Sequence, residues 1–255
     1  IVVEKPAIAR VEYRGNDELD IEDIQDVVNL KPNSVLSIAD VKANAEKIRE
    51  LYSEKGFFLA EVDYEVEVNP DRPELATVIF DIREFAKVEV KRITFLGNKN
   101  IPDDELLNIM ATRPSDWGSF LTSFGQFKEA AFQQDVQRIT AYYYDKGYVQ
   151  VKVQRPVVRL SRDKASMFIT LRIDESLQYD VGEVDLTGDF IVDKEELESM
   201  VEITETEDGT FSFGTMRSDL QKIRTLYQDQ GYAYVNINPL TKIREEDQVV
   251  DVTYD

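Results

Sequence analysis

The chain has 255 residues, 42% of them apolar, so it can bury the cores of two or three domains of ordinary size. Cysteine and histidine are absent, which excludes thiol nucleophiles, disulfides, Cys/His zinc sites and imidazole general bases. Fifty Asp and Glu against 30 Lys and Arg give a net charge of -20, which should repel nucleic acid. We expect a folded protein without catalytic residues, metal or cofactor, and without a nucleic-acid partner.

Three stretches of alternating apolar residues each run into a glycine, and each predicts a β-strand that ends in a turn. They are residues 8–15, 90–97 and 181–188. Asn16, Asn98 and Asp189 follow the three glycines. Glycine reaches a positive φ without steric cost, so the pair of glycine and Asn or Asp suits such a turn.

Two helices are predicted after each of these strands. Acidic residues precede the short first helices, and we expect them to act as N-caps: Asp20, Asp103 with Asp104, and Asp193. The second helices show apolar residues at helical spacing over residues 38–52, 131–143 and 220–227, and only Asp135 breaks the apolar stripe. Each second helix carries a tyrosine four residues before a glycine, at 52 and 56, 143 and 147, and 227 and 231. This spacing indicates a C-cap glycine, and we expect the tyrosine to pack the helix onto a sheet.

A β-hairpin is predicted after each C-cap glycine, because two alternating runs are separated by a polar turn. The paired runs are 60–68 with 75–83, 149–160 with 167–173, and 233–243 with 249–254. Strand, two helices and hairpin thus recur three times, which predicts an α+β fold of three tandem β-α-α-β-β modules. We place the modules at residues 6–85, 86–175 and 176–255. Residues 1–5 read as the end of a truncated preceding module, so we expect the chain to be part of a longer array.

The recurring order of strand, Gly-Asn turn, two helices, Gly-aromatic pair and hairpin resembles the POTRA domain over essentially the whole chain. The resemblance implies a three-stranded mixed sheet covered by two helices in each module. POTRA domains form the periplasmic part of BamA-type outer-membrane assembly proteins, of two-partner secretion transporters and of organellar relatives. Three abutting copies look most like the BamA type. The middle copy also carries an insertion at 112–127 similar to one in the third BamA POTRA domain, so the three modules resemble POTRA 2, 3 and 4.

The resemblance further implies a non-catalytic periplasmic arm that is tethered to the outer membrane by a C-terminal membrane barrel. Such an arm would bind unfolded outer-membrane protein clients and accessory assembly lipoproteins by β-strand augmentation. Two alternatives are the POTRA region of a two-partner secretion or other outer-membrane transporter, and a non-catalytic scaffold module. A carboxylate-based glycosidase is a further alternative, but nothing in the sequence marks a pair of acidic residues for that role.

A sheet edge offers unpaired backbone N–H and C=O groups to another strand, and the family suggests that the first strand of each hairpin is this edge. Pro156 and Pro239 lie in two of these runs, which favours an edge because proline cannot donate to a sheet ladder. An edge that is merely protected against aggregation is an equally acceptable interpretation. The candidate protein-binding residues are Val62, Tyr64, Val66, Val149, Val151, Val153, Arg155, Val158, Leu160, Tyr234 and Asn236.

The middle module differs from its neighbours in charge and in its insertion. Residues 86–175 carry 14 basic and 11 acidic side chains, against 10 and 20 in residues 1–85 and 6 and 19 in residues 176–255. Its hairpin could therefore dock an acidic partner, or could simply present a solvated basic face; if one contact is preferred, we expect it at residues 149–160. The insertion either packs under its own loop or meets a neighbouring module or partner, and the candidate contacts are Arg113, Trp117, Phe120 and Phe124.

Overall fold

The computed structural model describes residues 5–115 and 127–255. Within it the chain divides into two compact units. The first unit comprises residues 1–93, 111–134 and 158–169, and the second comprises residues 94–110, 135–157 and 170–255. The boundary between the units therefore runs through the predicted middle module, and the contacts described below lie inside one unit or the other.

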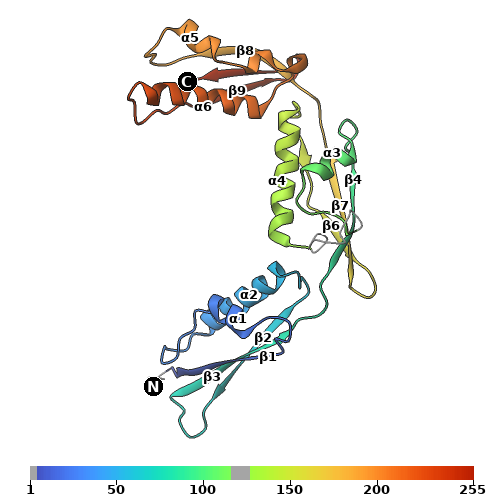
Figure 1. Ribbon diagram of the computed structural model, residues 1–255, viewed down its shortest axis with the longest axis vertical. Coiled ribbons are helices and arrows are strands. Elements are labelled where there is room, and N and C mark those ends of the chain that lie inside the picture. The colour runs from blue at the N-terminus through green and yellow to red at the C-terminus, as the bar shows by residue number, and fades with distance from the viewer. Residues whose placement is uncertain (1–4, 116–126) are drawn as a thin grey trace. The chain divides into compact units, whose positions relative to one another are not determined.

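The first module contains a mixed three-stranded sheet and two helices (Figure 1). Its sheet has the order β1-β3-β2, with β1 parallel and β2 antiparallel to the central β3. The elements in chain order are β1 (Ala7–Arg14), α1 (Ile21–Val27), α2 (Ile38–Glu54), β2 (Glu61–Val68) and β3 (Leu75–Arg83).

The second module repeats this order with one added strand. Its sheet has the order β4-β7-β5, and β6 also pairs with β7. The elements are β4 (Glu89–Leu96), α3 (Asp103–Ile109), α4 (Glu129–Asp145), β5 (Lys152–Val153), β6 (Val157–Leu160) and β7 (Ser166–Asp174). The two strands β5 and β6 occupy the single long run predicted at 149–160, so the sheet has four strands where we expected three.

The third module again has a mixed three-stranded sheet, of order β8-β10-β9, with β8 parallel and β9 antiparallel to β10. Its elements are β8 (Asp180–Leu186), α5 (Lys194–Ser199), the 3-10 turns η1 (Ile203–Glu205) and η2 (Glu207–Gly209), α6 (Phe213–Asp229), β9 (Pro239–Arg244) and β10 (Val249–Tyr254). The predicted α+β fold of three tandem modules is confirmed.

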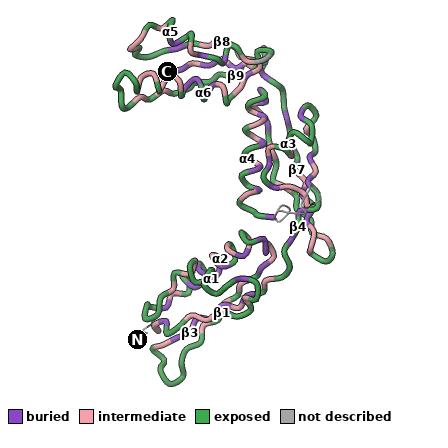
Figure 2. Tube along the Cα trace, in the orientation of Figure 1, coloured by how far each residue is buried: buried purple, intermediate pink, exposed green. Residues whose placement is uncertain are grey.

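The core of the first module lies between its helices and one face of its sheet. Ile24 of α1, Ile48 and Tyr52 of α2 and Val78 and Phe80 of β3 are fully buried in one cluster. Figure 2 shows this alternation of buried and exposed positions along the elements. The helix periodicity and the strand alternation thus meet at one face, as the sequence pattern requires.

Glycine is needed where the first strand of a module turns against the closing strand. Gly15 and Gly97 have φ values of 79° and 96°. A Cβ atom on Gly15 would lie 2.2 Å from the carbonyl oxygen of Ile82, and one on Gly97 would lie 2.1 Å from that of Ile173. Both the conformation and the close approach therefore exclude a side chain.

The predicted acidic caps do not make capping hydrogen bonds. Asp20 and Asp193 stand at the N-cap positions of α1 and α5 but their side chains accept no cap bond, and the N-cap of α3 is Pro102. Side-chain caps instead begin the long helices, where Ser37 accepts from the Asp40 amide and Ser212 from the Thr215 amide. The carboxylates of the short helices remain near helix N-termini, where their charge is favourable.

Candidate protein-binding edges

Strand β2 forms one edge of the first sheet, because it pairs with β3 alone among the described strands. The predicted residues Val62, Tyr64 and Val66 lie on it, but their side chains pack against the module core. The alternate positions, Glu61, Asp63, Glu65 and Glu67, are exposed. An added strand would therefore meet the free backbone of β2 with carboxylates beside it.

A groove runs beside this edge, between α2 and β2, with a volume of about 640 Å³. Arg83 of β3 approaches two carboxylates of β2, with its guanidinium 2.7 Å from Glu61 and 2.9 Å from Asp63. The groove is lined by Lys42, Ala45, Glu46, Val62, Asp63, Tyr64, Glu65, Asp81 and Arg83. A peptide segment in this groove would therefore meet both positive and negative side chains.

The third module has a groove at the equivalent place, between α6 and the start of β9, with a volume of about 580 Å³. When the modules are aligned on Tyr52 and Tyr227, Leu220 takes the place of Ala45 and Ile237 that of Val62. Its lining is Gly214, Arg217, Ser218, Leu220, Gln221, Arg224, Ile237 and Pro239. This set contains two arginines and no carboxylate, although the module as a whole is strongly acidic.

Strand β9 is the matching edge, since it pairs only with β10 in the described chain. It is shorter than predicted and begins at Pro239, which pairs with Tyr254. The predicted residues Tyr234 and Asn236 are exposed but precede the strand, so they do not form part of the edge ladder.

The middle edge is broken into two pieces. Val153 lies in β5 opposite Ile173, and Val158 and Leu160 lie in β6, whose four residues are all exposed. Arg155 lies between the two strands, next to Pro156, whose missing N–H interrupts the ladder.

Val149 and Val151 do not belong to this edge, although the sequence pattern placed them there. Val151 is 6% exposed and precedes β5, and Val149 packs against the hydrophobic core of the third module. The sequence pattern predicted a strand here because a buried connecting segment and a half-buried strand show the same alternation of apolar and polar residues.

Of the insertion residues, Arg113 is half-buried, and Trp117, Phe120 and Phe124 fall outside the described residues. Phe127, at the end of the predicted insertion, is buried and stands edge-on to Phe58 at a centroid distance of 4.8 Å. It also contacts Phe132 of α4. At this position Phe127 serves as a packing residue.

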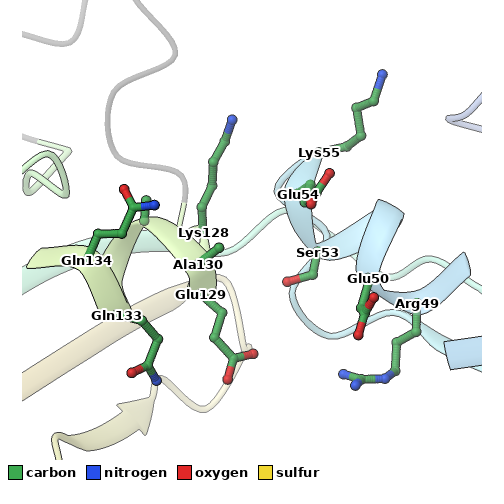
Figure 3. A pocket seen from close by; sticks show the side chains of 11 residues that line it. Arg49, Glu50, Ser53, Glu54, Lys55, Lys128, Glu129, Ala130, Gln133 and Gln134 are labelled. Atoms are coloured by element: carbon green, nitrogen blue, oxygen red, sulfur yellow. The ribbon is translucent and has the colours of Figure 1, made fainter. Parts of the chain in front are cut away.

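A hollow of about 890 Å³ lies between the last turns of α2 and the start of α4 (Figure 3). Its lining is Arg49, Glu50, Ser53, Glu54, Lys55, Lys128, Glu129, Ala130, Ala131, Gln133 and Gln134. The charged head groups in Figure 3 point in different directions and do not converge on one point. Small-molecule sites are mostly apolar with a few convergent polar groups, so this hollow does not resemble one.

Residues 5–115 and 127–255 show neither of two further kinds of feature, a metal site and a membrane-spanning helix. No group of three or more acidic side chains there is arranged to hold a metal ion. No helix in this part of the chain is both long and apolar enough to cross a bilayer.

A carboxylate that the sequence analysis did not single out closes the first two modules. Glu84 accepts hydrogen bonds from the Tyr52 hydroxyl, at 2.8 Å, and from the Glu18 amide, at 3.0 Å. Glu175 accepts from the Tyr143 hydroxyl at 3.0 Å and from the Asn100 amide at 3.1 Å. We call this arrangement the closing clasp.

The clasp joins the second helix, the first turn and the last strand of its module. Burial is the main cause that raises the pKa of both Tyr52 and Tyr143, and the adjacent carboxylates add to it. The hydroxyls therefore stay protonated as donors. The prediction that the tyrosine packs its helix onto the sheet is confirmed for these two residues, which are fully buried.

Each long helix also carries a buried polar residue eight positions before its tyrosine, which is Tyr52, Tyr143 or Tyr227. These polar residues are Asn44, Asp135 and Asp219. Asn44 accepts from the Asn29 amide at 2.7 Å, and Asp219 accepts from the amides of Glu202 and Ile203 at 3.0 and 2.9 Å. In the first and third modules this side chain thus holds the connection between the two helices. Asp135, which breaks the apolar stripe of its helix, thus stands at the same repeat position as Asn44 and Asp219.

The family model "POTRA: Surface antigen variable number repeat" matches residues 6–84, 88–176 and 179–255. The chain belongs to the POTRA family. The three matches cover nearly the whole chain, one for each repeat that the structure shows.

Curated relatives of these POTRA domains are outer-membrane assembly factors. The chain is 29% identical over 255 residues to "Outer membrane protein assembly factor BamA" of Nitratidesulfovibrio vulgaris, covering 99% of this chain and 32% of the relative. It is 24% identical over 258 residues to the BamA protein of Neisseria meningitidis serogroup B, covering 98% of this chain and 31% of the relative. The chain thus spans about a third of the length of these relatives. The resemblance to BamA-type POTRA domains is confirmed.

Among solved structures, the POTRA chain is similar to POTRA domains 3–5 of Haemophilus influenzae BamA. The TM-score is 0.51 at 19% sequence identity, over 98% of this chain and 95% of the other. At this level of identity the similarity concerns the fold.

Proposed function

We propose that this chain is part of the periplasmic arm of an outer-membrane β-barrel assembly protein, and that it binds extended segments of unfolded outer-membrane proteins by strand addition. The observation that carries the proposal is the placement of β2 and β9, which are both edge strands beside a groove formed with the second helix. A free edge gives affinity through the backbone, and a neighbouring groove gives selectivity through side chains.

The similarity to BamA proteins supports the rest of the assignment. In the longer protein the arm would be tethered to a C-terminal membrane barrel, would lie in the periplasm and would also bind accessory assembly lipoproteins. The modules would be POTRA 2, 3 and 4, with boundaries at 6–85, 86–175 and 176–255. The connection from α3 to α4, at 110–128, is longer than those at 28–37 and 200–212, in keeping with that numbering. No catalytic role is part of the proposal.

The middle module offers a different surface for the same task. Strand β6 is exposed along its whole length, and Val157 and Val158 lie there next to Arg159. An extended client segment with alternating apolar and acidic side chains would pack on the two valines and pair with Arg159. Trp117, Phe120 and Phe124 are proposed as contacts of a partner or neighbouring module on the strength of their sequence alone.

Backbone NMR with an unfolded peptide from an outer-membrane β-strand tests the proposal. Strand addition should shift the amide signals of β2, β6 and β9, and leave those of the opposite edges β1, β4 and β8 unchanged. A matched peptide that is N-methylated at alternate residues keeps the side chains but loses half of its backbone donors, so its binding should be strongly reduced. Equal binding of the two peptides, or shifts confined to β1, β4 and β8, would contradict the proposal.

A further inference from the structure

The segment that directly follows each second helix is covered in two modules and open in the third. The equivalent segments are residues 56–60, 147–151 and 231–235, aligned on the C-cap glycines. The aromatic residue after the glycine is 4% exposed at Phe57 and 5% at Tyr148, but 50% at Tyr232. Tyr234, two positions further on, is 100% exposed. The turn after α6 is accordingly drawn as exposed in Figure 2.

In the first two modules the chain that continues after the closing strand covers this segment. The amide of Val88 donates to the Gly56 carbonyl at 3.4 Å, and that of Tyr179 donates to the Gly147 carbonyl at 2.9 Å. Val88 comes four residues after the clasp residue Glu84, and Tyr179 comes four residues after Glu175. The junction therefore has the same register both times.

The preceding residue adds a second contact at each junction. The ammonium of Lys87 lies 4.9 Å from the centroid of the Phe57 ring. At the next junction the Gln178 side-chain amide donates to the Lys146 carbonyl at 3.0 Å. The covering strand thus contributes both a main-chain donor and a long polar side chain.

The residue after the aromatic completes the junction by apolar packing. Phe58 stands edge-on to Phe127, which precedes α4, and Val149 packs against the core of the third module. Both residues are half-buried, whereas Ala233 at the equivalent position of the third module is exposed.

The surroundings of the C-cap glycines also differ between the second and third modules. A Cβ atom on Gly147 would lie 2.7 Å from both Thr210 and the Tyr179 carbonyl oxygen, whereas one on Gly231 would have no atom within 4 Å. Within the described chain no residue donates to the Gly231 carbonyl as Val88 and Tyr179 do to its equivalents. We call residues 231–234 the open cap.

We propose that the open cap is the docking site for the first strand of a further module of the same fold that follows Asp255 in the longer protein. Asp255 aligns with Asp81, because Tyr254 pairs with Leu186 and Pro239 as Phe80 pairs with Tyr13 and Tyr64. The position of the clasp residue therefore falls three residues beyond Asp255, and the seventh residue beyond Asp255 would donate its main-chain N–H to the Gly231 carbonyl. The sixth residue beyond Asp255 would cover Tyr232, as Lys87 covers Phe57. The chain spans only about a third of its BamA relatives, which leaves room for such a strand.

This inference does not depend on client binding, because it concerns a contact within one chain. A cysteine pair tests it in the full-length protein, from which any other cysteine has been removed by substitution. One cysteine replaces Gln230 and the other replaces the sixth residue beyond Asp255. The positive control is the equivalent pair Lys146→Cys and Gln178→Cys, at two exposed positions joined by a hydrogen bond at the existing junction. A second control moves the first cysteine to the exposed Gln221, more than two turns earlier in α6.

A short bis-maleimide should join the Gln230 pair within one chain as efficiently as the positive control, and the Gln221 pair several-fold less. Hydroxyl-radical modification of Tyr232 in the full-length protein should be as slow as that of Tyr148. A linkage between two chains, a yield no better than that of the Gln221 pair, or several-fold faster modification of Tyr232 than of Tyr148 would overturn the proposal.

Discussion

At the residue scale, one carboxylate links three parts of each of the first two modules. Glu175 is 5% exposed, yet its carboxylate accepts hydrogen bonds from a tyrosine hydroxyl and from main-chain amides of the turn after β4. Hydrogen bonds to a buried charged group are worth more than neutral ones, and an unpaired charge there would cost more still. The closing clasp therefore holds the second helix, the turn after the first strand and the closing strand together. This arrangement keeps the neighbouring strands in register.

Removing the clasp should loosen the turn that it holds. Glu175→Gln should destabilise the second module by about 2–3 kcal/mol, because an amide replaces a charged acceptor and its N–H₂ group faces donors. Tyr143→Phe should cost about 1 kcal/mol. Amide hydrogen exchange at Asn100 and Ile101 measures both effects.

The adjacent tyrosine provides the control. Tyr142 donates to the exposed Glu105 carboxylate at 2.7 Å, so Tyr142→Phe should change exchange at Asn100 much less than Tyr143→Phe does. Equal effects of the two substitutions would show that the clasp has no special role.

The same exposed pair gives a pH prediction. The hydrogen bond to Glu105 is the main cause that raises the pKa of Tyr142 to about 12. A raised pKa means that the folded state favours the neutral phenol, so this stabilisation is present below about pH 10 and is lost as the pH rises through about 12. The phenolate absorbance missing from Tyr142→Phe should therefore titrate near pH 12, and Glu105→Gln should move it towards 10. A midpoint unchanged by Glu105→Gln would contradict this cause.

Residue spacing predicted the tyrosines and glycines correctly, but it could not predict their carboxylate partner. Glu84 and Glu175 follow exposed strand positions, and an acidic residue there reads as ordinary surface charge. Only the fold brings them to tyrosines 32 residues earlier in the chain. Asp135 likewise reads as an interruption of the apolar stripe, although Asn44 and Asp219 stand at the same repeat position.

At the element scale, the first strand of each module depends on a turn that accepts only glycine in two of the three copies. Gly97→Ala should destabilise the second module by more than about 2 kcal/mol, because its φ is positive and the added carbon would lie 2.1 Å from the Ile173 carbonyl oxygen. Gly188→Ala should cost only about 1 kcal/mol, since it has the strained φ of 103° without a close atom. Thermal unfolding of the two variants measures the difference, and equal losses would contradict the steric argument.

The groove beside β9, which two arginines and no carboxylate line, predicts a preference for acidic segments. Replacing Arg217 and Arg224 by Glu should weaken binding of an unfolded client peptide with acidic residues by about three- to tenfold, because two attractive charges become repulsive. Titration calorimetry measures the affinity. The matched control is Lys194→Glu, which changes an exposed charge paired with Asp185 outside the groove and should leave binding unchanged. The prediction fails if the control weakens binding as much as the double variant.

The edges themselves were only partly predictable from the sequence. The outer position of β2 and β9 agrees with the expectation, whereas the alternation at 149–160 and 233–243 suggested strands longer than those observed. Pro156 splits the first of these runs. Tyr234 and Asn236 precede the ladder in the second run, because β9 begins only at Pro239.

At the scale of the whole molecule, three copies of one module differ in charge, in the continuity of the hairpin edge and in the cover over the segment after the second helix. The first and third modules are acidic and the middle one is slightly basic. Under the proposed strand addition, the hairpin edges would offer backbone groups to client segments in differently charged surroundings. Weak binding at several edges of one chain would then add up through effective concentration.

Site-specific photo-crosslinking in the full-length protein during assembly of an outer-membrane client tests this account most directly. A photoreactive residue is placed at the exposed Thr241 of β9, and in a matched variant at the exposed Glu183 of β8 on the opposite edge of the same sheet. The account predicts client adducts from position 241, with few or none from position 183. Adducts of equal yield from both edges, or from position 183 alone, would contradict strand addition at the hairpin edge.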